Sequence, residues 1–243
     1  MGNFKTLIGW TSIVSAQVFV STSCVTLPKV TGNGNERAEE RTLAQFDSLI
    51  VEGDVEVVLL SAAKNVKVVG DDNLIGFVKT KVDGDTLRVS VDCDCVVMPS
   101  KPIVVTVPAG DLKYIEANDK AHIDAASLTT ANMEFELNDQ SRLKLSNIDA
   151  KQLDIIASDD SKVEVSGKTE DCFVQTDDDV VFDARDLVIQ KAEVNSAGDS
   201  DVFLKVVAKL DADLSDDAVL KLGREPREQK TQLDDSASIL RQY

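Results

Sequence analysis

A polar pair of residues recurs every 18 to 20 positions through the second half of the chain. The second residue of each pair serves here as its anchor, and the anchors are Asp119, Asp139, Asp159, Asp178, Gly198, Asp216 and Asp235. A unit this short cannot bury an apolar face by itself, so successive copies must stack into one continuous core. The repeat therefore predicts a solenoid.

The residues on both sides of each anchor predict two strands per copy. Small or apolar residues stand two and four positions after the anchor, as in Ala121 and Ile123, while polar residues stand between them. Before the next anchor, Met133, Phe135 and Leu137 alternate in the same way. Side chains alternate faces along a strand, so these residues share an inner face. We predict an all-β fold, a right-handed parallel β-helix or β-solenoid with coils of about 19–20 residues.

The first residues have the pattern of an export signal. A start with one Lys precedes an apolar stretch over residues 6–20, which is too short and too polar for a membrane span. Small residues then lead to Cys24, as in a bacterial lipobox, although Ser21 stands where an aliphatic residue is usual. We predict a signal peptide over residues 1–23 and lipid attachment at Cys24. A plain signal peptide cut nearby is the alternative.

The rest of the chain divides by composition and periodicity. Residues 24–42 are rich in Pro, Gly, Asn and charged residues, which is typical of a tether. Residues 43–243 are interpreted as a single β-helical domain. Within it, residues 43–111 form a less regular N-terminal β cap, and residues 112–243 form the seven-coil repeat region.

Composition limits the classes of partner. The formal net charge is −17, which argues against nucleic acid, because affinity for a phosphate backbone comes from clustered Lys and Arg. Aromatic residues are only 5% of the chain, as suits thin coils better than a wide pocket. Cleavage of the signal would also remove Trp10, the one Trp.

The first third of the chain resembles a known family. Residues 32–59 include the run Phe46–Asp47–Ser48–Leu49, and the segments 83–89 and 103–115 follow in matching order and spacing. This pattern is similar to the bacterial auto-transporter adhesin family, or head GIN domain, best known from Bacteroidetes. The resemblance covers residues 32–240 and implies an exported β-helical domain, often behind a lipoprotein signal, with an adhesion role. The resemblance implies no catalytic residues. At the turns between strands, this chain has Asp and Asn where the family typically has Ser and Gly.

The remaining residues indicate no cofactor. Cys93 and Cys95 flank Asp94 and would be too close for a comfortable disulfide, and zinc needs more ligands than they supply. Cys172 falls at an inward position and is expected to be a buried free thiol. His122, the only His, is expected on the surface without a catalytic role.

Three functions remain open. The first is a non-enzymatic, lipid-anchored envelope protein, at the outer membrane or cell surface or otherwise periplasmic, that displays an adhesin-like or structural surface to a protein or glycan partner. The second is a β-helix carbohydrate-active enzyme, a polysaccharide lyase or hydrolase, with candidates at Asp159, Asp160, Asp178, Asp179 and Arg185. The third is a calcium-dependent envelope module whose Asp ladder binds ions weakly, although Asp at such corners also has a purely structural reason, its tolerance of tight turns.

Overall fold

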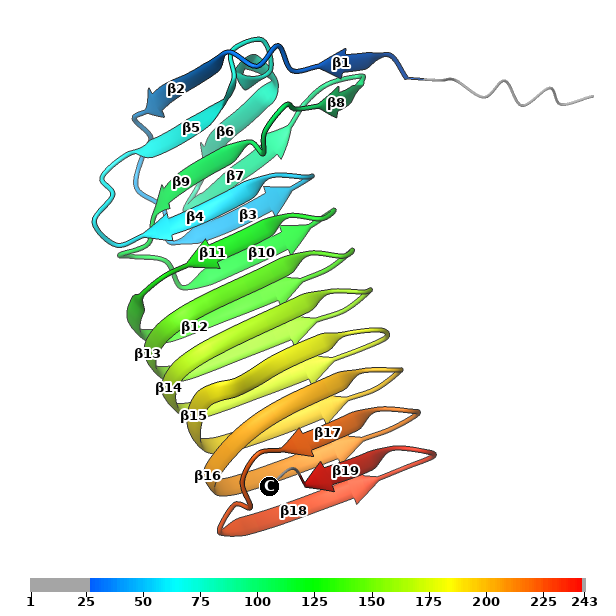
Figure 1. Cartoon of the computed structure of the whole chain (residues 1–243). Helices are drawn as coiled ribbons and strands as arrows, with labels where there is room; N and C mark the ends of the chain where they lie inside the picture. Colours follow the sequence, from blue (N-terminus) through cyan, green and yellow to red (C-terminus); the bar gives the residue numbers. More distant parts are fainter. Residues whose placement is uncertain (1–26, 242–243) are drawn as a thin grey trace, which may run out of the picture.

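Parallel coils stacked into a rod make up most of the molecule (Figure 1). The computed structural model describes residues 27–241, so the expected signal peptide and Cys24 lie outside the described residues. The only helical element in this range is the 3-10 turn η1 (Ile75–Phe77). Within the same range, no helix has the length and apolar character needed to cross a membrane.

The repeat region forms the lower part of the rod, where each coil pairs in parallel with the next (Figure 1). In the column that starts at His122, the partners are Arg142, Lys162 and Val181, so equivalent residues stack in register. The strands are β10 (Tyr114–Asn118), β11 (His122–Ala125), β12 (Leu128–Leu137), β13 (Arg142–Ala157), β14 (Lys162–Thr176), β15 (Val181–Ser196), β16 (Asp201–Leu214), β17 (Val219–Leu222), β18 (Glu228–Leu233) and β19 (Ser238–Arg241).

The predicted inner face is the core of the rod. Met133, Phe135 and Leu137 are buried, as are Ala121 and Ile123 after the first corner. The equivalent residues of the following coils are buried as far as Leu220, whereas Ala237 and Ile239 in the last coil are only half-buried. The predicted β-solenoid is therefore confirmed.

The coils continue above the repeat region, in an order that the sequence does not follow. β3 (Ser48–Glu52) and β4 (Glu56–Leu60) pair in parallel with β10 and β11. β7 (Thr86–Val91) and β9 (Val104–Pro108) then pair in parallel with the other edges of β3 and β4. The chain thus forms the coil of β3 and β4 first and adds the coil of β7 and β9 above it. It then continues below β3 and β4 with β10 and β11.

Antiparallel strands close the upper end, as the predicted N-terminal β cap requires. β5 (Val66–Asp71) pairs with β9, β6 (Val78–Asp83) pairs with β7, and β2 (Glu36–Arg41) pairs with β5. This change of direction ends the parallel stacking, because the outermost strands no longer offer a coil on which another coil could continue.

The expected tether over residues 24–42 is wrong for residues 29–41. β1 (Lys29–Thr31) pairs with β8 (Val96–Met98), and β2 lies within the cap. The charged side chains of β2 suggested a solvated linker. Strand pairing depends on backbone hydrogen bonds, however, and an edge strand can keep charged side chains in water.

Candidate functional site

The seven anchors lie at the corners where each coil turns, along one edge of the rod (Figure 1). All seven have a left-handed backbone, with φ from 55° to 66°. Asp, Asn and Gly tolerate this conformation better than other residues. The turn chemistry therefore accounts for the repeated Asp without any ligand, and it also accounts for Gly198 in the same position.

Hydrogen bonds tie neighbouring corners together. The backbone N–H of Lys120 donates to the carbonyl of Asp139 at 3.0 Å, and that of Gln140 donates to the carbonyl of Asp159 at 2.8 Å. The Asn138 side-chain amide donates to Asn118 Oδ1 at 2.9 Å, and the Ser158 hydroxyl donates to Asn138 Oδ1 at 2.9 Å. Polar side chains at these corners are thus occupied in holding coils to one another.

Like charges crowd at the middle of the Asp ladder. The pKa of Asp178 is raised, chiefly by repulsion from Asp177, and further by partial desolvation and by Asp159 and Asp179. Within residues 27–241, however, no group of three or more Asp, Glu, His or Cys side chains has a geometry that could hold a metal ion. The ladder therefore concentrates negative charge at one edge of the rod.

The structure brings the four candidate carboxylates together at adjacent corners but leaves Arg185 apart from them. Asp159, Asp160, Asp178 and Asp179 lie at the corners, whereas Arg185 belongs to a flat side of β15. There the Arg185 guanidinium donates to both carboxylate oxygens of Asp183 and lowers the pKa of that carboxyl. Arg185 is thus already paired, away from the corner carboxylates.

A cation–π cluster lies beside the Arg185–Asp183 ion pair. The Arg185 guanidinium lies 4.9 Å and Lys221 Nζ 4.4 Å from the centroid of the Phe203 ring. Lys221 also forms an ion pair of 2.6 Å with Asp201. A ring approached by two cations is not a free platform for a sugar, so this cluster stabilises the coils.

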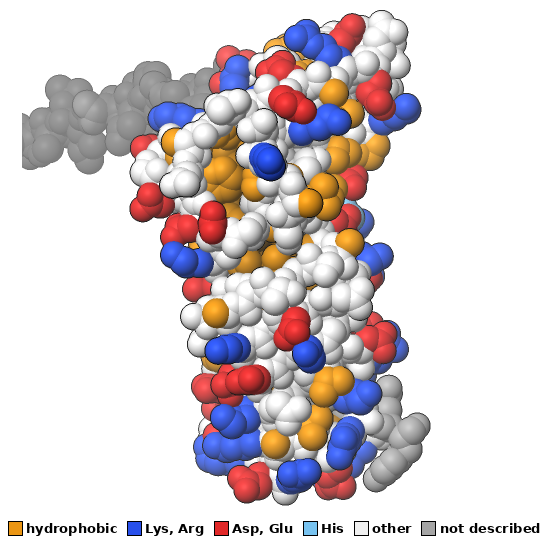
Figure 2. Space-filling model, turned by 90° about the vertical axis from the view of Figure 1, so that its left-hand side faces the viewer, with side chains coloured by type: hydrophobic (Ala, Val, Ile, Leu, Met, Phe, Trp, Pro, Cys, Tyr) orange, Lys and Arg blue, Asp and Glu red, His pale blue; other side chains and the backbone are white. Residues whose placement is uncertain are grey.

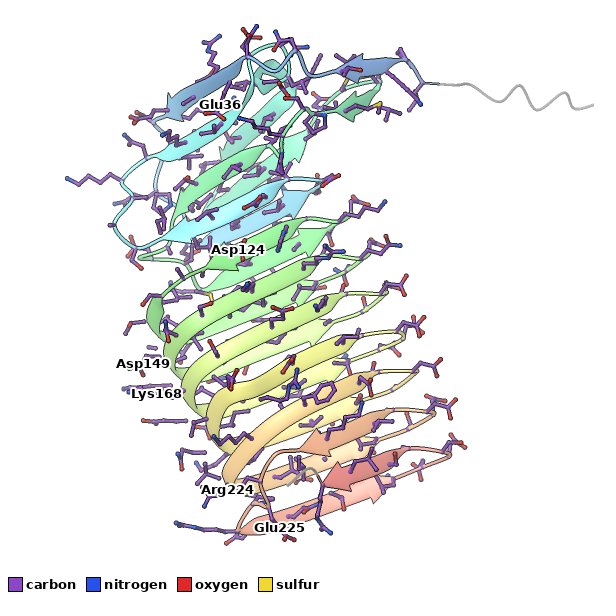
Figure 3. All side chains as sticks on the ribbon, in the orientation of Figure 1. Glu36, Asp124, Asp149, Lys168, Arg224 and Glu225 are labelled. Atoms are coloured by element: carbon purple, nitrogen blue, oxygen red, sulfur yellow. A yellow bond between two sulfur atoms is a disulfide. The ribbon has the colours of Figure 1, made fainter. Side chains whose placement is uncertain are left out.

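Outward columns elsewhere on the rod form ion-pair ladders. Lys168 pairs with Asp149 at 2.9 Å across two coils, and both are labelled at the side of the rod in Figure 3. His122 is half-exposed, as predicted, and its Nε2 lies 4.0 Å from Asp124 Oδ2. These contacts are side-chain pairing on a solvated surface.

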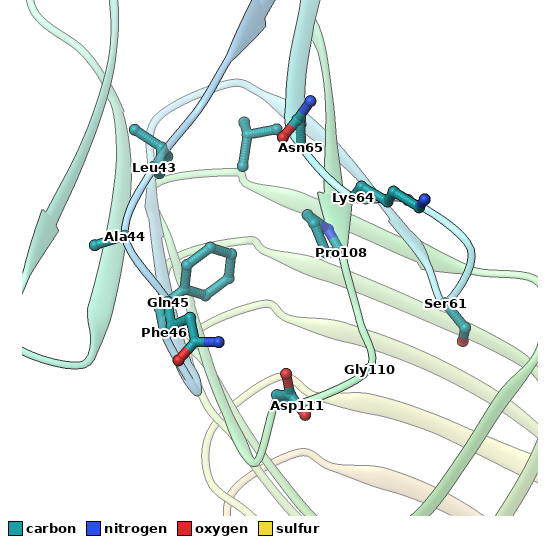
Figure 4. Close-up of a pocket in the computed structure, with 12 residues that line it drawn as sticks. Leu43, Ala44, Gln45, Phe46, Ser61, Lys64, Asn65, Pro108, Gly110 and Asp111 are labelled. Atoms are coloured by element: carbon teal, nitrogen blue, oxygen red, sulfur yellow. The ribbon is translucent and has the colours of Figure 1, made fainter.

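Two adjacent hollows lie where the cap meets the solenoid. Two adjacent pockets of about 340 and 680 Å³ share Gln45, Phe46, Gly110 and Asp111, and we name them together the junction groove. The Phe46 ring lies inside the groove near Pro108 and Asn65 (Figure 4). In the space-filling view of Figure 2, apolar side chains form the floor of a hollow in the upper half of the molecule.

An ion pair borders the junction groove. Lys113 Nζ lies 2.7 Å from Asp47 Oδ2, and this hydrogen bond lowers the pKa of Asp47 and raises that of Lys113. The groove could not be predicted from the sequence, because its walls come from segments around residues 45, 64, 110 and 131, which only the stacking order brings together.

The cysteines confirm one expectation and correct another. Cys172 is a buried free thiol, as predicted, and burial raises its pKa to about 12. Cys93 and Cys95 form a disulfide with a Cα–Cα distance of 5.0 Å, so the expectation that they would not bridge is wrong. They lie in the loop between β7 and β8 rather than within a regular strand, which frees the backbone to bring the two sulfur atoms together.

The structure defines a class of protein, a β-solenoid closed by an antiparallel cap. The chain belongs to the family described as "Putative auto-transporter adhesin, head GIN domain", whose model matches residues 45–226. The predicted family is thereby confirmed.

Solved structures share the fold. A putative adhesin from Bacteroides fragilis has a TM-score of 0.75 at 16% identity, over 87% of this chain and 99% of that one. A putative lipid binding protein from Parabacteroides distasonis has a TM-score of 0.70 at 18% identity, over 88% and 100%. A putative adhesin from Parabacteroides merdae has a TM-score of 0.69 at 14% identity, over 89% and 100%. No curated protein matches this chain.

Proposed function

We propose that this chain is a non-enzymatic, exported envelope protein that displays its β-solenoid as an adhesin-like or structural surface. The observation that carries the proposal is the family match over residues 45–226, which include most of the stacked coils. Two solved neighbours of the same fold are described as putative adhesins, which supports the same role. The ion-paired outer columns suit a rod that holds a fixed surface in water.

The anchor of this display module is proposed at Cys24. Only four residues separate Cys24 from β1, which lies at the cap end of the rod (Figure 1). A lipid on Cys24 would hold the cap near the membrane and leave the last coil farthest from it. The partner would then be a protein or glycan met outside that membrane.

Intact mass of the protein purified from its native envelope tests the anchor. We expect a diacylglycerol-sized adduct on the wild-type chain and its loss in Cys24→Ala. The double variant Cys93→Ala, Cys95→Ala is the matched control, because it removes two other cysteines and should keep the adduct. A wild-type chain without any adduct would contradict the anchor.

The enzyme alternative is tested on the same purified protein. A screen of polysaccharides should show no release of reducing or unsaturated ends above background. Cleavage that Asp178→Asn or Arg185→Ala abolishes would overturn the non-enzymatic proposal and assign the corner carboxylates a catalytic role.

A further inference from the structure

The last coil of the rod has an unpaired edge. β18 pairs with β16 and β19 pairs with β17, and within residues 27–241 no strand is in register with their outer edges. The N–H of Asp234 donates back to Leu214 at 2.9 Å, and that of Ser238 donates back to Ala218 at 3.0 Å. Because peptide groups alternate direction along a strand, those of Gln229, Thr231, Leu233 and Ile239 point away from the stack. Such a row of free donors and acceptors is a template for another strand.

The apolar core also continues to this edge without a cover. Leu233 is 46% exposed and Ile239 is only half-buried, whereas Leu214 and Leu220, their partners in the coil above, are fully buried. Each of these side chains lacks the neighbour that one more layer of strands would supply. Covering this end therefore removes apolar surface from water as well as satisfying the backbone.

Charge separates this end from the rest of the molecule. Residues 223–241 carry four basic and four acidic side chains, so they are neutral in a chain of net charge −17. The net charge makes two copies of the chain repel each other on average, and this neutral end adds nothing to that repulsion. The lower part of the side seen in Figure 2 shows this mixture of blue and red groups.

The charges are also arranged along the coil with opposite signs at its two ends. Residues 224–230, before and in the first half of β18, carry three basic and two acidic side chains, a net charge of +1, whereas Asp234 and Asp235 at the corner after β18 carry −2. Two such strands side by side attract if they run antiparallel, because each acidic corner then meets the other strand's basic start.

The other end of the rod offers no edge of a parallel coil. The antiparallel strands β2, β5 and β6 cover it, so head-to-tail stacking of one rod on the next finds no parallel coil to extend. A molecule with one open coil edge forms a closed pair rather than a filament.

We propose that the outer edge of β18 and β19 is a docking surface for a second copy of this chain, paired antiparallel across a two-fold axis. In the register centred on Gln229, Glu228 of each copy opposes Lys230 of the other, and Arg224 opposes Asp234. Inward side chains then meet inward side chains, so the two cores join. This proposal does not depend on the lipid anchor.

Cross-linking in the native envelope tests this pairing on the full chain. Gln229→Cys places its thiol on the two-fold axis, and a short bis-maleimide should link two copies into a species of twice the chain's mass. Thr129→Cys is the control, because Thr129 is also exposed but lies on β12, near the cap and far along the rod from this edge. We expect at least a tenfold lower yield of this species from the control.

A charge swap in the Gln229→Cys background tests the register. Glu228→Lys alone sets like charges opposite each other and should lower cross-linking several-fold, and adding Lys230→Glu should restore it. Thermal unfolding of each variant verifies that the coil still folds. Absence of cross-linking at position 229, equal cross-linking at position 129, or indifference to Glu228→Lys would each overturn the proposal.

Discussion

Asp71 holds Ser100 through both of its carboxylate oxygens. Oδ2 accepts the Ser100 backbone N–H at 2.8 Å, and Oδ1 accepts the Ser100 hydroxyl at 2.6 Å. Oδ1 also accepts the Gly34 N–H at 2.7 Å, so one buried carboxylate ties the segment before β2 to the cap. A side chain at Gly32 would collide with this carboxylate, since its Cβ would lie 2.0 Å from Oδ2.

Neutralising Asp71 should destabilise the cap in a pH-dependent way. The Ser100 hydroxyl, followed by the Ser100 N–H, lowers the pKa of Asp71 below its ordinary 3.8. A lowered pKa contributes stability that is present above pH 4 and lost as pH falls through the folded-state value. Asp71→Asn should therefore lower Tm at pH 7, and the difference from wild type should shrink at pH 3. Asp72→Asn, at the exposed neighbouring carboxyl, should change Tm less at both pH values.

Removing charge from the crowded corner should have the opposite effect. The raised pKa of Asp178 means that its ionised form is disfavoured by folding, so the contribution of this carboxyl to stability is greatest below pH 4 and falls as pH rises through the folded-state pKa. Asp178→Asn keeps a residue that tolerates φ of 62° and should raise Tm at pH 7 but not at pH 3. The gain should diminish in 1 M salt. Asp213→Asn removes the same charge at an exposed strand position between Asn195 and Gln232, away from the corners, and an equal gain there would refute the local cause.

Gly167 should not tolerate any side chain. Its φ is 125°, and an added Cβ would lie 2.2 Å from the carbonyl oxygen of Ile148 in the preceding coil. Gly167→Ala should lower the free energy of unfolding by about 2–3 kcal/mol and Tm by roughly 4–12 °C. Gly76→Ala is the control, because an added Cβ there meets no atom within 4 Å and should leave Tm nearly unchanged.

The Cys172 thiol should be inert in the folded chain. Burial, with a smaller effect from Asp154, raises its pKa to about 12, so almost no thiolate forms at pH 8. Iodoacetamide should leave the native protein unmodified and should add one group per chain at Cys172 after unfolding in urea. In the Thr129→Cys variant, the exposed thiol should react under native conditions. Rapid native labelling at Cys172 would contradict its burial.

The corners and the inner columns of the repeat could be predicted from sequence, because each follows from one local rule repeated many times. A left-handed corner selects Asp or Gly, as at Asp139 and Gly198, and a paired strand alternates its side chains, as in Phe135 and Leu137. The corner and the alternating strands recur together with one period, so the pattern seen in one coil supports the prediction for the next.

The cap and the junction groove could not be predicted in the same way. β2 pairs with β5, about 30 residues away, through backbone groups that any sequence possesses. The groove beside Phe46 depends on β7 and β9 stacking above β3 and β4, which inverts chain order. Its residues follow no common period, so sequence alone offered no signal for them.

The in-register stack has a consequence for how the molecule opens. Each coil contacts only the coils directly before and after it, so stability is carried from neighbour to neighbour rather than by one shared centre. Amide hydrogens should then exchange fastest in β18 and β19, and progressively more slowly toward β13 and β14. A destabilising substitution in one coil would divide the rod into two parts that unfold separately. The position of the substitution along the rod therefore determines how much of the folded surface is lost.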